Sequence, residues 1–240
     1  MSVKRINLIS GPRNISTALM YSFGNRTDTS IIDEPMYAYY LNQTGRVHPG
    51  RDEIIESLPT DLEEVIDKLM SKAIDTPYYF IKGMAHHYLD IDLSFILNFE
   101  NVILIRDPKK LIFSFSKVIP EPKMSDIGIK REFELYNYLI SKGKDPVVLD
   151  SGEVLVDPES VLKKLCKKLE IPYSTSMLSW EKGTRPEDGV WAKYWYSNVH
   201  KSTGFQKNMT KNVELPTDLI PLYEESIPYY QELFKKSLKA

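Results

Sequence analysis

The segment from Val3 to Arg26, VKRINLISGPRNISTALMYSFGNR, constrains the fold more than any other. It opens with a short apolar run from Ile6 to Ile9, which is typical of a buried strand, and the run ends in a Ser-Gly-Pro turn. After the turn, apolar residues recur every fourth position from Ile15 to Phe23. This spacing predicts a helix with one buried face that starts directly after the strand.

The turn between this strand and helix is rich in groups that bind anions. A helix that starts there points its free backbone N–H groups and the positive end of its dipole toward the turn. The pattern therefore favours a cradle for phosphate or sulfate. It is not a Walker A loop, which needs Gly-Lys where this chain has Ser16-Thr17, and an ordinary capped turn remains the alternative. The cradle would consist of Gly11, Pro12, Arg13, Asn14, Ser16 and Thr17.

Composition excludes several classes of protein. The chain has 240 residues and a formal net charge of -2, so nothing favours a nucleic-acid partner. No apolar run approaches membrane-spanning length. The chain enters a strand within three residues, so we expect no signal peptide and a cytoplasmic protein. The single cysteine, Cys166, lies in a helical pattern, where we expect a buried thiol.

Strand and helix patterns alternate along the chain. Further strands are predicted at 30–32, 78–81, 101–105 and 147–149. Helices are predicted at 59–73, after Asp107-Pro108 and after Asp157-Pro158, where each Asp would be the N-cap and each Pro the first helical residue. This order predicts an α/β fold of three layers, with a mostly parallel sheet flanked by helices. We find no repeat and no linker, so we expect a single domain over residues 1–240.

Three segments fall outside this alternation. Residues 125–142 predict an aromatic-rich helix, and residues 183–205 an aromatic-rich loop of the kind that forms lids or binding loops. The alternative for the loop is that its aromatic side chains only attach it to the core. The last segment, 216–239, is interrupted by Pro221 and Pro228 and would pack on the domain or on a partner.

Chemical groups follow four of the predicted strands. In a parallel sheet, ligands bind beyond the carboxyl ends of the strands, so these groups should meet. Two of the turns carry an arginine with hydroxyl groups, which suggests a ligand with two separated anionic groups. Besides the first turn, the strand ends supply Asp33 and Glu34, Lys82 with His86 and His87, and Arg106 with Ser114 eight residues later.

These segments resemble those of sulfotransferases. SGPRNISTAL is similar to the family's 5′-phosphosulfate loop, and RDPKKLIFSFSK is similar to its 3′-phosphate segment. FIKGMAHH stands at the family's third-strand lysine, VVLDSGEVLVDPESVLKKLCKKLEIP resembles a late strand and helix, and KSTGF stands where a C-terminal loop contacts the 3′-phosphate. The resemblance runs in order from about Ile6 to Phe205. It implies a P-loop-type α/β fold and the donor 3′-phosphoadenosine-5′-phosphosulfate (PAPS), and we expect no metal.

The resemblance also implies roles for individual residues. The cradle would hold the 5′ side of PAPS, Arg106 and Ser114 the 3′-phosphate, with weaker contacts from the C-terminal loop. The chain departs from the family pattern at Ile15, where a glycine is usual, and at Met84, where cytosolic members have a histidine base. The C-terminal loop residues are Lys201, Ser202, Thr203 and Gly204.

The catalytic base must therefore be another residue. Glu34 is our first candidate, because Asp-Glu-Pro resembles the glutamate position of several bacterial and carbohydrate sulfotransferases; the alternative is a carboxylate pair that caps a turn. The adjacent His86 and His87 come second, and we expect at most one of them to face the site. Arg13 would keep Glu34 ionised. Lys82 would be the cation on the departing phosphate or sulfonate, unless it is a surface lysine that closes a strand.

Taken together, these residues predict a PAPS-dependent sulfotransferase that acts on a hydroxyl or amine of a small molecule. The alternatives are a P-loop kinase and a non-catalytic nucleotide-binding module of the same fold. Oligomeric state is not indicated. Aromatic side chains suit a partly apolar acceptor. The acceptor pocket would be lined by Met36, Tyr37, Tyr39 and Tyr40, the helix from Ser125, and residues 191–196.

Overall fold

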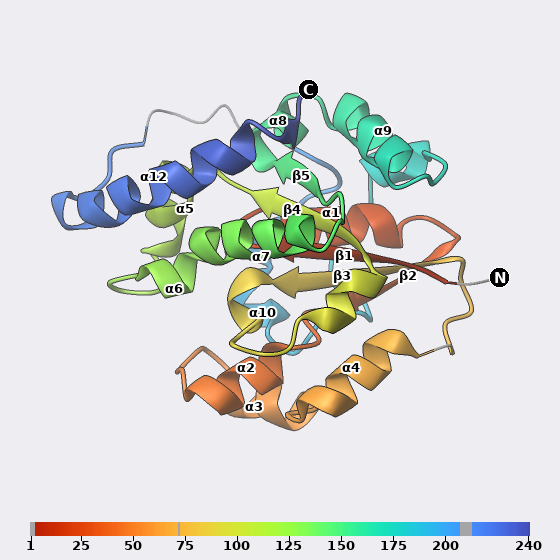
Figure 1. The fold of residues 1–240 in the computed structure, drawn as a ribbon, viewed down its shortest axis with the longest axis horizontal. Coiled ribbons are helices and arrows are strands. Elements are labelled where there is room, and N and C mark those ends of the chain that lie inside the picture. The colour runs from red at the N-terminus through yellow and green to blue at the C-terminus, as the bar shows by residue number, and fades with distance from the viewer. Residues whose placement is uncertain (1–2, 72, 207–212) are drawn as a thin grey trace.

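The computed structural model describes residues 3–71, 73–206 and 213–240. Its centre is a parallel six-stranded sheet with the order β2-β3-β1-β4-β5-β6 (Figure 1). All five predicted strands are present, and a sixth, short one lies at the edge. The strands are β1 (Lys4–Ser10), β2 (Thr29–Asp33), β3 (Tyr78–Met84), β4 (Glu100–Ile105), β5 (Val147–Asp150) and β6 (Ser237–Leu238).

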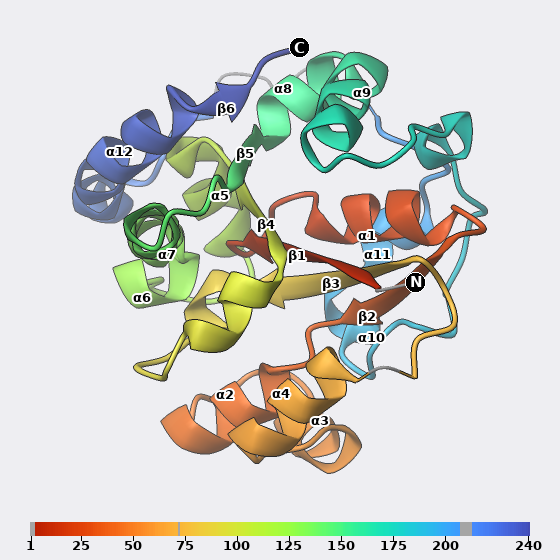
Figure 2. The same ribbon diagram turned by 45° about the vertical axis from the view of Figure 1, so that its right-hand side comes forward.

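Helices cover both faces of this sheet, which confirms the expected three layers (Figure 2). On one face lie α1 (Ser16–Gly24), α8 (Ser151–Val156) and α9 (Pro158–Lys168). On the other lie α5 (Pro108–Phe115), α6 (Met124–Ile127), α7 (Ile129–Ser141) and α12 (Ile220–Phe234). Beside β2 are α2 (Tyr37–Thr44), α3 (Arg51–Ser57) and α4 (Leu62–Met70). Of two further short helices, α10 (Ala192–Trp195) packs with residues of α2 and α3, and α11 (Ser197–His200) lies near α1.

The strands bury side chains on both faces because both are covered by helices. Ile6 and Leu8 of β1 pack toward α1 and α9, whereas Ile9 packs toward α5 and α7. On the α1 face, the rings of Phe23 and Phe80 stack 4.2 Å apart. Each side chain buried in this way contributes about 1.5–3 kcal/mol, which fixes α1 and hence the loop before it.

The predicted helix starts at two Asp-Pro pairs are confirmed. The Asp107 side chain accepts a hydrogen bond from the Lys109 amide, and Pro108 is the first residue of α5. Asp157 caps α9 in the same way. Cys166 of α9 is buried, and burial raises the pKa of its thiol to about 11. No helix in the part of the chain that the structure describes has the length and apolarity to cross a membrane.

Other boundaries differ from the prediction. The single helix expected over residues 125–142 is divided into α6 and α7 at Gly128, which has a φ of 79°. The helix expected over 59–73 is shorter, and the loop expected over 183–205 contains α10 and α11. The third strand runs three residues further than predicted, so that Lys82 lies within β3 and not after it.

The C-terminal segment packs on this chain. Helix α12 contacts α7 and α5, and the ring centroids of Tyr229 and Phe133 of α7 lie 5.5 Å apart. Pro221 is in its first turn, where a missing N–H costs little, but Pro228 lies in the helix interior, where proline usually ends a helix. The sequence pattern therefore did not predict this helix. The contacts of α12 with α7 and α5 compensate for the backbone hydrogen bond that Pro228 cannot donate.

Candidate active site

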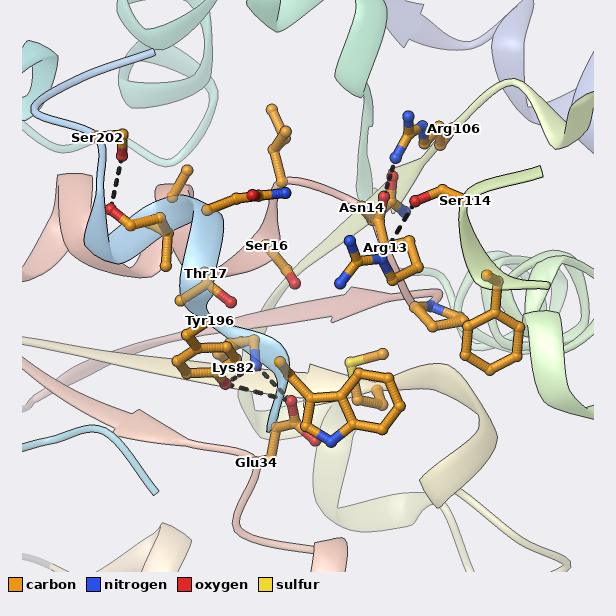
Figure 3. A pocket seen from close by; sticks show the side chains of 18 of the residues that line it. Arg13, Asn14, Ser16, Thr17, Glu34, Lys82, Arg106, Ser114, Tyr196 and Ser202 are labelled. Carbon is orange, nitrogen blue, oxygen red and sulfur yellow. Dashed lines mark hydrogen bonds and ion pairs between the residues drawn. The ribbon is translucent and has the colours of Figure 1, made fainter. Parts of the chain in front are cut away.

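A cavity of about 380 Å³ lies at the carboxyl ends of β1 to β4. Helix α1 begins at its wall, and the segment with α10 and α11 closes another side. Figure 3 shows two groups of polar side chains in it: Arg13, Arg106 and Ser114 on one side, and Glu34, Lys82 and Tyr196 on the other, with Ser16 and Thr17 between them. The sheet therefore brings together groups that follow four different strands, as the strand order requires.

The loop from β1 to α1 has the form of an anion cradle. Helix α1 has Ile15 as its N-cap, and no side chain caps the helix, so the first-turn N–H groups are left without a side-chain partner. Ile15 has a φ of -31°, which needs no glycine; the left-handed residue of the loop is Arg13, with a φ of 57°. The departure from the family's glycine therefore does not obstruct the loop, and the backbone strain lies at Arg13.

Two arginines lie at this cradle without a carboxylate partner. Arg106 donates a hydrogen bond to the carbonyl of Arg13, and Arg13 Nε lies 3.2 Å from Ser114 Oγ. Burial lowers the pKa of both guanidinium groups, and for Arg106 the charge of Arg13 adds to this effect. Neither forms an ion pair with any residue of the described chain. Because arginine stays protonated in proteins, the pair leaves a partly buried positive charge that an anion would neutralise.

The second group is a buried ion-pair cluster. Lys82 Nζ lies 2.8 Å from Asp33 Oδ1 and 2.6 Å from the Tyr196 hydroxyl, and it also donates to Glu34 Oε1. Tyr196 in turn lies 2.7 Å from Asp33 Oδ2. Lys82 is only 1% exposed, so the alternative of a surface lysine is wrong. All three protons of its ammonium group have an acceptor.

Glu34 keeps one carboxylate oxygen free. Oε1 is bound by Lys82, whereas Oε2 has no hydrogen-bond partner among the described residues and Glu34 lines the cavity. Burial raises the pKa of Glu34, the charge of Lys82 opposes this effect, and that of Asp33 adds to it. The backbone of Glu34 is left-handed, with a φ of 39°. Such strain in a non-glycine residue is often found at functional sites.

One expectation about Glu34 is wrong. Its cationic partner is Lys82, not Arg13, whose guanidinium group binds Ser114 instead. The pKa of Lys82 is raised: burial alone would lower it, but the two carboxylates together outweigh burial. Local sequence could not show this pairing, because it depends on Asp33 and Lys82 being neighbours across β2 and β3 and on the distant segment that covers them.

Both histidines are among the residues that line the cavity, contrary to the expectation that at most one of them would face the site. They form a short 3₁₀ turn after β3, and their rings lie 4.5 Å apart. Burial lowers the pKa of His86 to about 3 and that of His87 well below its ordinary value. Both are therefore neutral at physiological pH. No group of His, Cys, Asp or Glu suited to hold a metal ion is present in residues 3–71, 73–206 and 213–240.

The remaining predicted residues are divided between cavity and core. Of the side chains proposed to line the acceptor pocket, Tyr37, Trp195 and Tyr196 line the cavity, but Met36, Tyr39 and Tyr40 are packed in the core. Residues 125–142 do not line it. Of the C-terminal loop, Ser202 and Gly204 line the cavity, and Lys201 and Thr203 are exposed outside it.

Gly11 also lies outside the cavity lining, and its role in the loop is steric. A Cβ atom at this position would come within 2.6 Å of the Ile127 carbonyl oxygen, so glycine is needed for the loop to pack against α6. Further residues that line the cavity but were not singled out from the sequence are His48, Phe115, Leu155, Asn198, Val199, Phe205 and Gln206. Phe115, Leu155 and Phe205 stand within segments that resemble those of sulfotransferases, but nothing in their local sequence predicts that they line the cavity, and only the packing of distant segments reveals them.

Comparisons with known proteins identify the family of this chain. The model of a family described as "Sulfotransferase domain" matches residues 4–237. Two relatives from Arabidopsis thaliana, branched-chain-amino-acid aminotransferase-like proteins 1 and 2, are 38% and 36% identical over 93% and 95% of the chain. The chain spans only about two fifths of the length of these relatives, 40% and 41%.

Solved structures show the same fold. A sulfotransferase domain from the curacin biosynthetic pathway has a TM-score of 0.61 at 15% identity and covers 97% of this chain and 98% of its own. A sulfotransferase from Alicyclobacillus acidocaldarius has a TM-score of 0.54 at 10% identity and covers 99% and 98%. The fold is therefore α/β of the P-loop type, as predicted. The chain belongs to the sulfotransferase domain family.

Proposed function

We propose that this chain transfers a sulfonyl group from PAPS to a hydroxyl or amine of a small molecule, with Glu34 as the general base. One observation carries this proposal: a single cavity has two arginines without carboxylate partners at one side and a carboxylate with a free oxygen at the other. A donor with two anionic groups needs the arginines, and an acceptor that must lose a proton needs the carboxylate.

The donor set fits PAPS. Arg106 and Ser114 would hold the 3′-phosphate, and Arg13, Ser16, Thr17 and the first-turn N–H groups of α1 would hold the 5′-phosphosulfate. These groups are all cations or hydrogen-bond donors, which is what phosphate and sulfate oxygens require. Ser202 and Gly204 reach the same cavity from the far segment. The proposal that PAPS binds here is thus supported by the positive charge and hydrogen-bond donors of these residues, and by their position in one cavity.

Glu34 would act on the acceptor. The acceptor oxygen or nitrogen forms a bond to sulfur, the bond from sulfur to the 5′-phosphate oxygen breaks, and the acceptor proton passes to Glu34 Oε2. Burial helps here, because it raises the pKa of Glu34, and an ionised carboxylate with a raised pKa takes a proton more readily. Lys82 holds Glu34 in place, and it would contact the departing group only by releasing one of its three partners.

Thermal unfolding with the product nucleotide 3′-phosphoadenosine-5′-phosphate (PAP) tests the donor. A ligand at about 100 times its Kd adds about 2.7 kcal/mol, or roughly 5–10 °C in Tm for a chain of this size. We expect this shift with PAP, without Mg²⁺, and its loss in Arg106→Ala. The control is Arg51→Ala, since Arg51 pairs with Asp52 on the surface, away from the cavity.

The possible outcomes separate the candidate functions. A shift with Mg-ATP alone would contradict the proposal and favour a kinase. No shift with either nucleotide would contradict the proposed donor, and a shift with PAP in a protein that transfers no sulfonyl group would favour a non-catalytic nucleotide-binding module. A shift with PAP that persists in Arg106→Ala would leave the donor in place but remove Arg106 from the 3′-phosphate site.

A further inference from the structure

Tyr196 is the point where the buried cluster around Glu34 meets the C-terminal part of the chain. It is 4% exposed and follows α10, whereas its partners lie in or directly after β2 and β3. Its hydroxyl lies 2.6 Å from Lys82 Nζ, 2.7 Å from Asp33 Oδ2 and 3.1 Å from Trp191 Nε1. Glu34 Oε1 lies 3.5 Å from the same oxygen.

The direction of these hydrogen bonds is determined by chemistry. The Lys82 ammonium and the Trp191 indole N–H can only donate, so the Tyr196 oxygen accepts from both. Its own proton is then left for the carboxylates, and Asp33 is the nearer of the two. Burial, and after it the charges of Asp33 and Glu34, raise the pKa of Tyr196 well above its ordinary value, so the hydroxyl keeps its proton.

The charges of the cluster do not balance. Lys82 supplies one positive charge, and Asp33 and Glu34 supply two negative charges when both are ionised. The excess negative charge must be stabilised by uncharged donors, because a buried charge without partners is costly. Two such donors reach the carboxylates from the same segment: the Tyr196 hydroxyl and the amide of Gly189, 3.3 Å from Asp33 Oδ2.

The geometry points to Tyr196 as a positioning residue for the base. The inference rests on the proposed function: Tyr196 holds Lys82 against Glu34 Oε1 and offers its own hydroxyl to the excess negative charge that the two carboxylates share, so that Glu34 stays ionised with Oε2 free toward the cavity. Tyr196 itself takes no proton from the acceptor. Its position in the chain also matters, because the same segment carries Ser202 and Gly204 into the cavity wall.

No other group near Glu34 can replace this hydroxyl. Besides Asp33 and Lys82, the titratable groups around it are Tyr37 from α2 and His87 after β3. The Tyr37 hydroxyl already lies 2.8 Å from His48 Nδ1. His87 is buried as a neutral ring, and neither of its nitrogens has a hydrogen-bond partner among the described residues. Among the described residues, Tyr196 is thus the uncharged side-chain donor to the carboxylate pair, beside the charged donor Lys82.

A Tyr196→Phe variant tests the inference, with Tyr194→Phe as the matched control. Tyr194 lies in α10 but is 42% exposed and has no part in the cluster. We expect kcat of Tyr196→Phe to fall on the order of tenfold at acid pH, the effect of losing a hydrogen bond to a charged group. The loss should shrink as pH rises, because the variant raises the pKa of Glu34 and a higher pH restores its ionised form. The donor KM should not change.

A second measurement does not depend on turnover. The carboxyl carbon of Glu34 is followed by NMR in protein labelled with ¹³C-glutamate, with Glu34→Gln to assign its signal. The pH is varied, and the titration midpoint of Glu34 is compared between the variants. A higher midpoint in Tyr196→Phe than in wild type and in Tyr194→Phe supports the inference, even if the protein transfers no sulfonyl group and the proposed function fails. An unchanged midpoint, an equal loss of kcat at every pH, or an equal effect of Tyr194→Phe would overturn it.

Discussion

A Glu34→Gln variant is expected to lose about 10²–10⁴-fold in kcat while it binds PAP as tightly as the wild type. Glutamine has nearly the same shape and can still accept a hydrogen bond from Lys82 through its carbonyl oxygen, but it cannot take the acceptor proton. Because Glu34 lies across the cavity from Arg13 and Arg106, donor affinity should not depend on its charge (Figure 3). Steady-state kinetics and calorimetric titration with PAP measure the two quantities separately.

The pH dependence of the wild type is the companion to this result. Only ionised Glu34 can accept a proton, and its pKa is raised by burial. As the pH is lowered, the rate should therefore begin to fall at a higher pH than it would with an exposed glutamate as the base. This loss of rate at acid pH should be absent from Glu34→Gln. Glu53→Gln is the control, since Glu53 pairs with Lys193 on the surface. A Glu34→Gln variant with normal kcat would remove Glu34 from the base role and bring His86 forward.

A Lys82→Met variant is expected to lose about 3–5 kcal/mol of unfolding free energy at neutral pH. Methionine fills a similar volume, but Asp33 and Glu34 would then be buried without their cation. Urea unfolding at several pH values measures the loss. Without Lys82, burial and the charge of Asp33 keep the pKa of Glu34 above that of a glutamate in the unfolded chain. The part of the penalty due to Glu34 is therefore full at high pH and shrinks as Glu34 becomes protonated toward about pH 4.

The surface pair of Lys193 and Glu53 is a matched control for this variant. Its N–O distance is 2.7 Å, as short as in the buried cluster, but both side chains are more than half exposed. Water and salt screen such a pair, so we expect Lys193→Met to unfold like the wild type. Equal losses in the two variants would show that the Lys82 cluster contributes no more than a surface ion pair.

Local sequence patterns were sufficient for much of the fold. Strands, their order with helices and the Asp107 and Asp157 caps depend on residues a few positions apart, and the structure has all of them. The turn between β1 and α1 is predicted for the same reason. Breaks within helices were harder to predict. Gly128 divides a segment whose other residues favour one helix, and α12 continues through Pro228, a residue that usually ends a helix.

The cluster around Glu34 was only partly accessible from sequence. Glu34 and Lys82 were chosen because they follow strands, but their partner Tyr196 is 114 positions from Lys82 and lies in a segment without periodicity. Whether a lysine near a strand end is exposed or buried depends on what covers it, here the segment with α10 and α11. No local pattern carries that information, and for the same reason Arg13 was wrongly paired with Glu34.

The central place of β1 in the sheet affects how the protein is made. Its two neighbours are β3 and β4, so Ser10 pairs with Met84 on one side and Leu104 on the other. At about 5–20 residues per second, a ribosome needs roughly 5–20 s after making β1 to supply both neighbours. During this interval the apolar run of Ile6, Leu8 and Ile9 has no sheet to join. The nascent chain should therefore need protection by chaperones early in synthesis, and slower translation between β1 and β4 should lower the soluble yield.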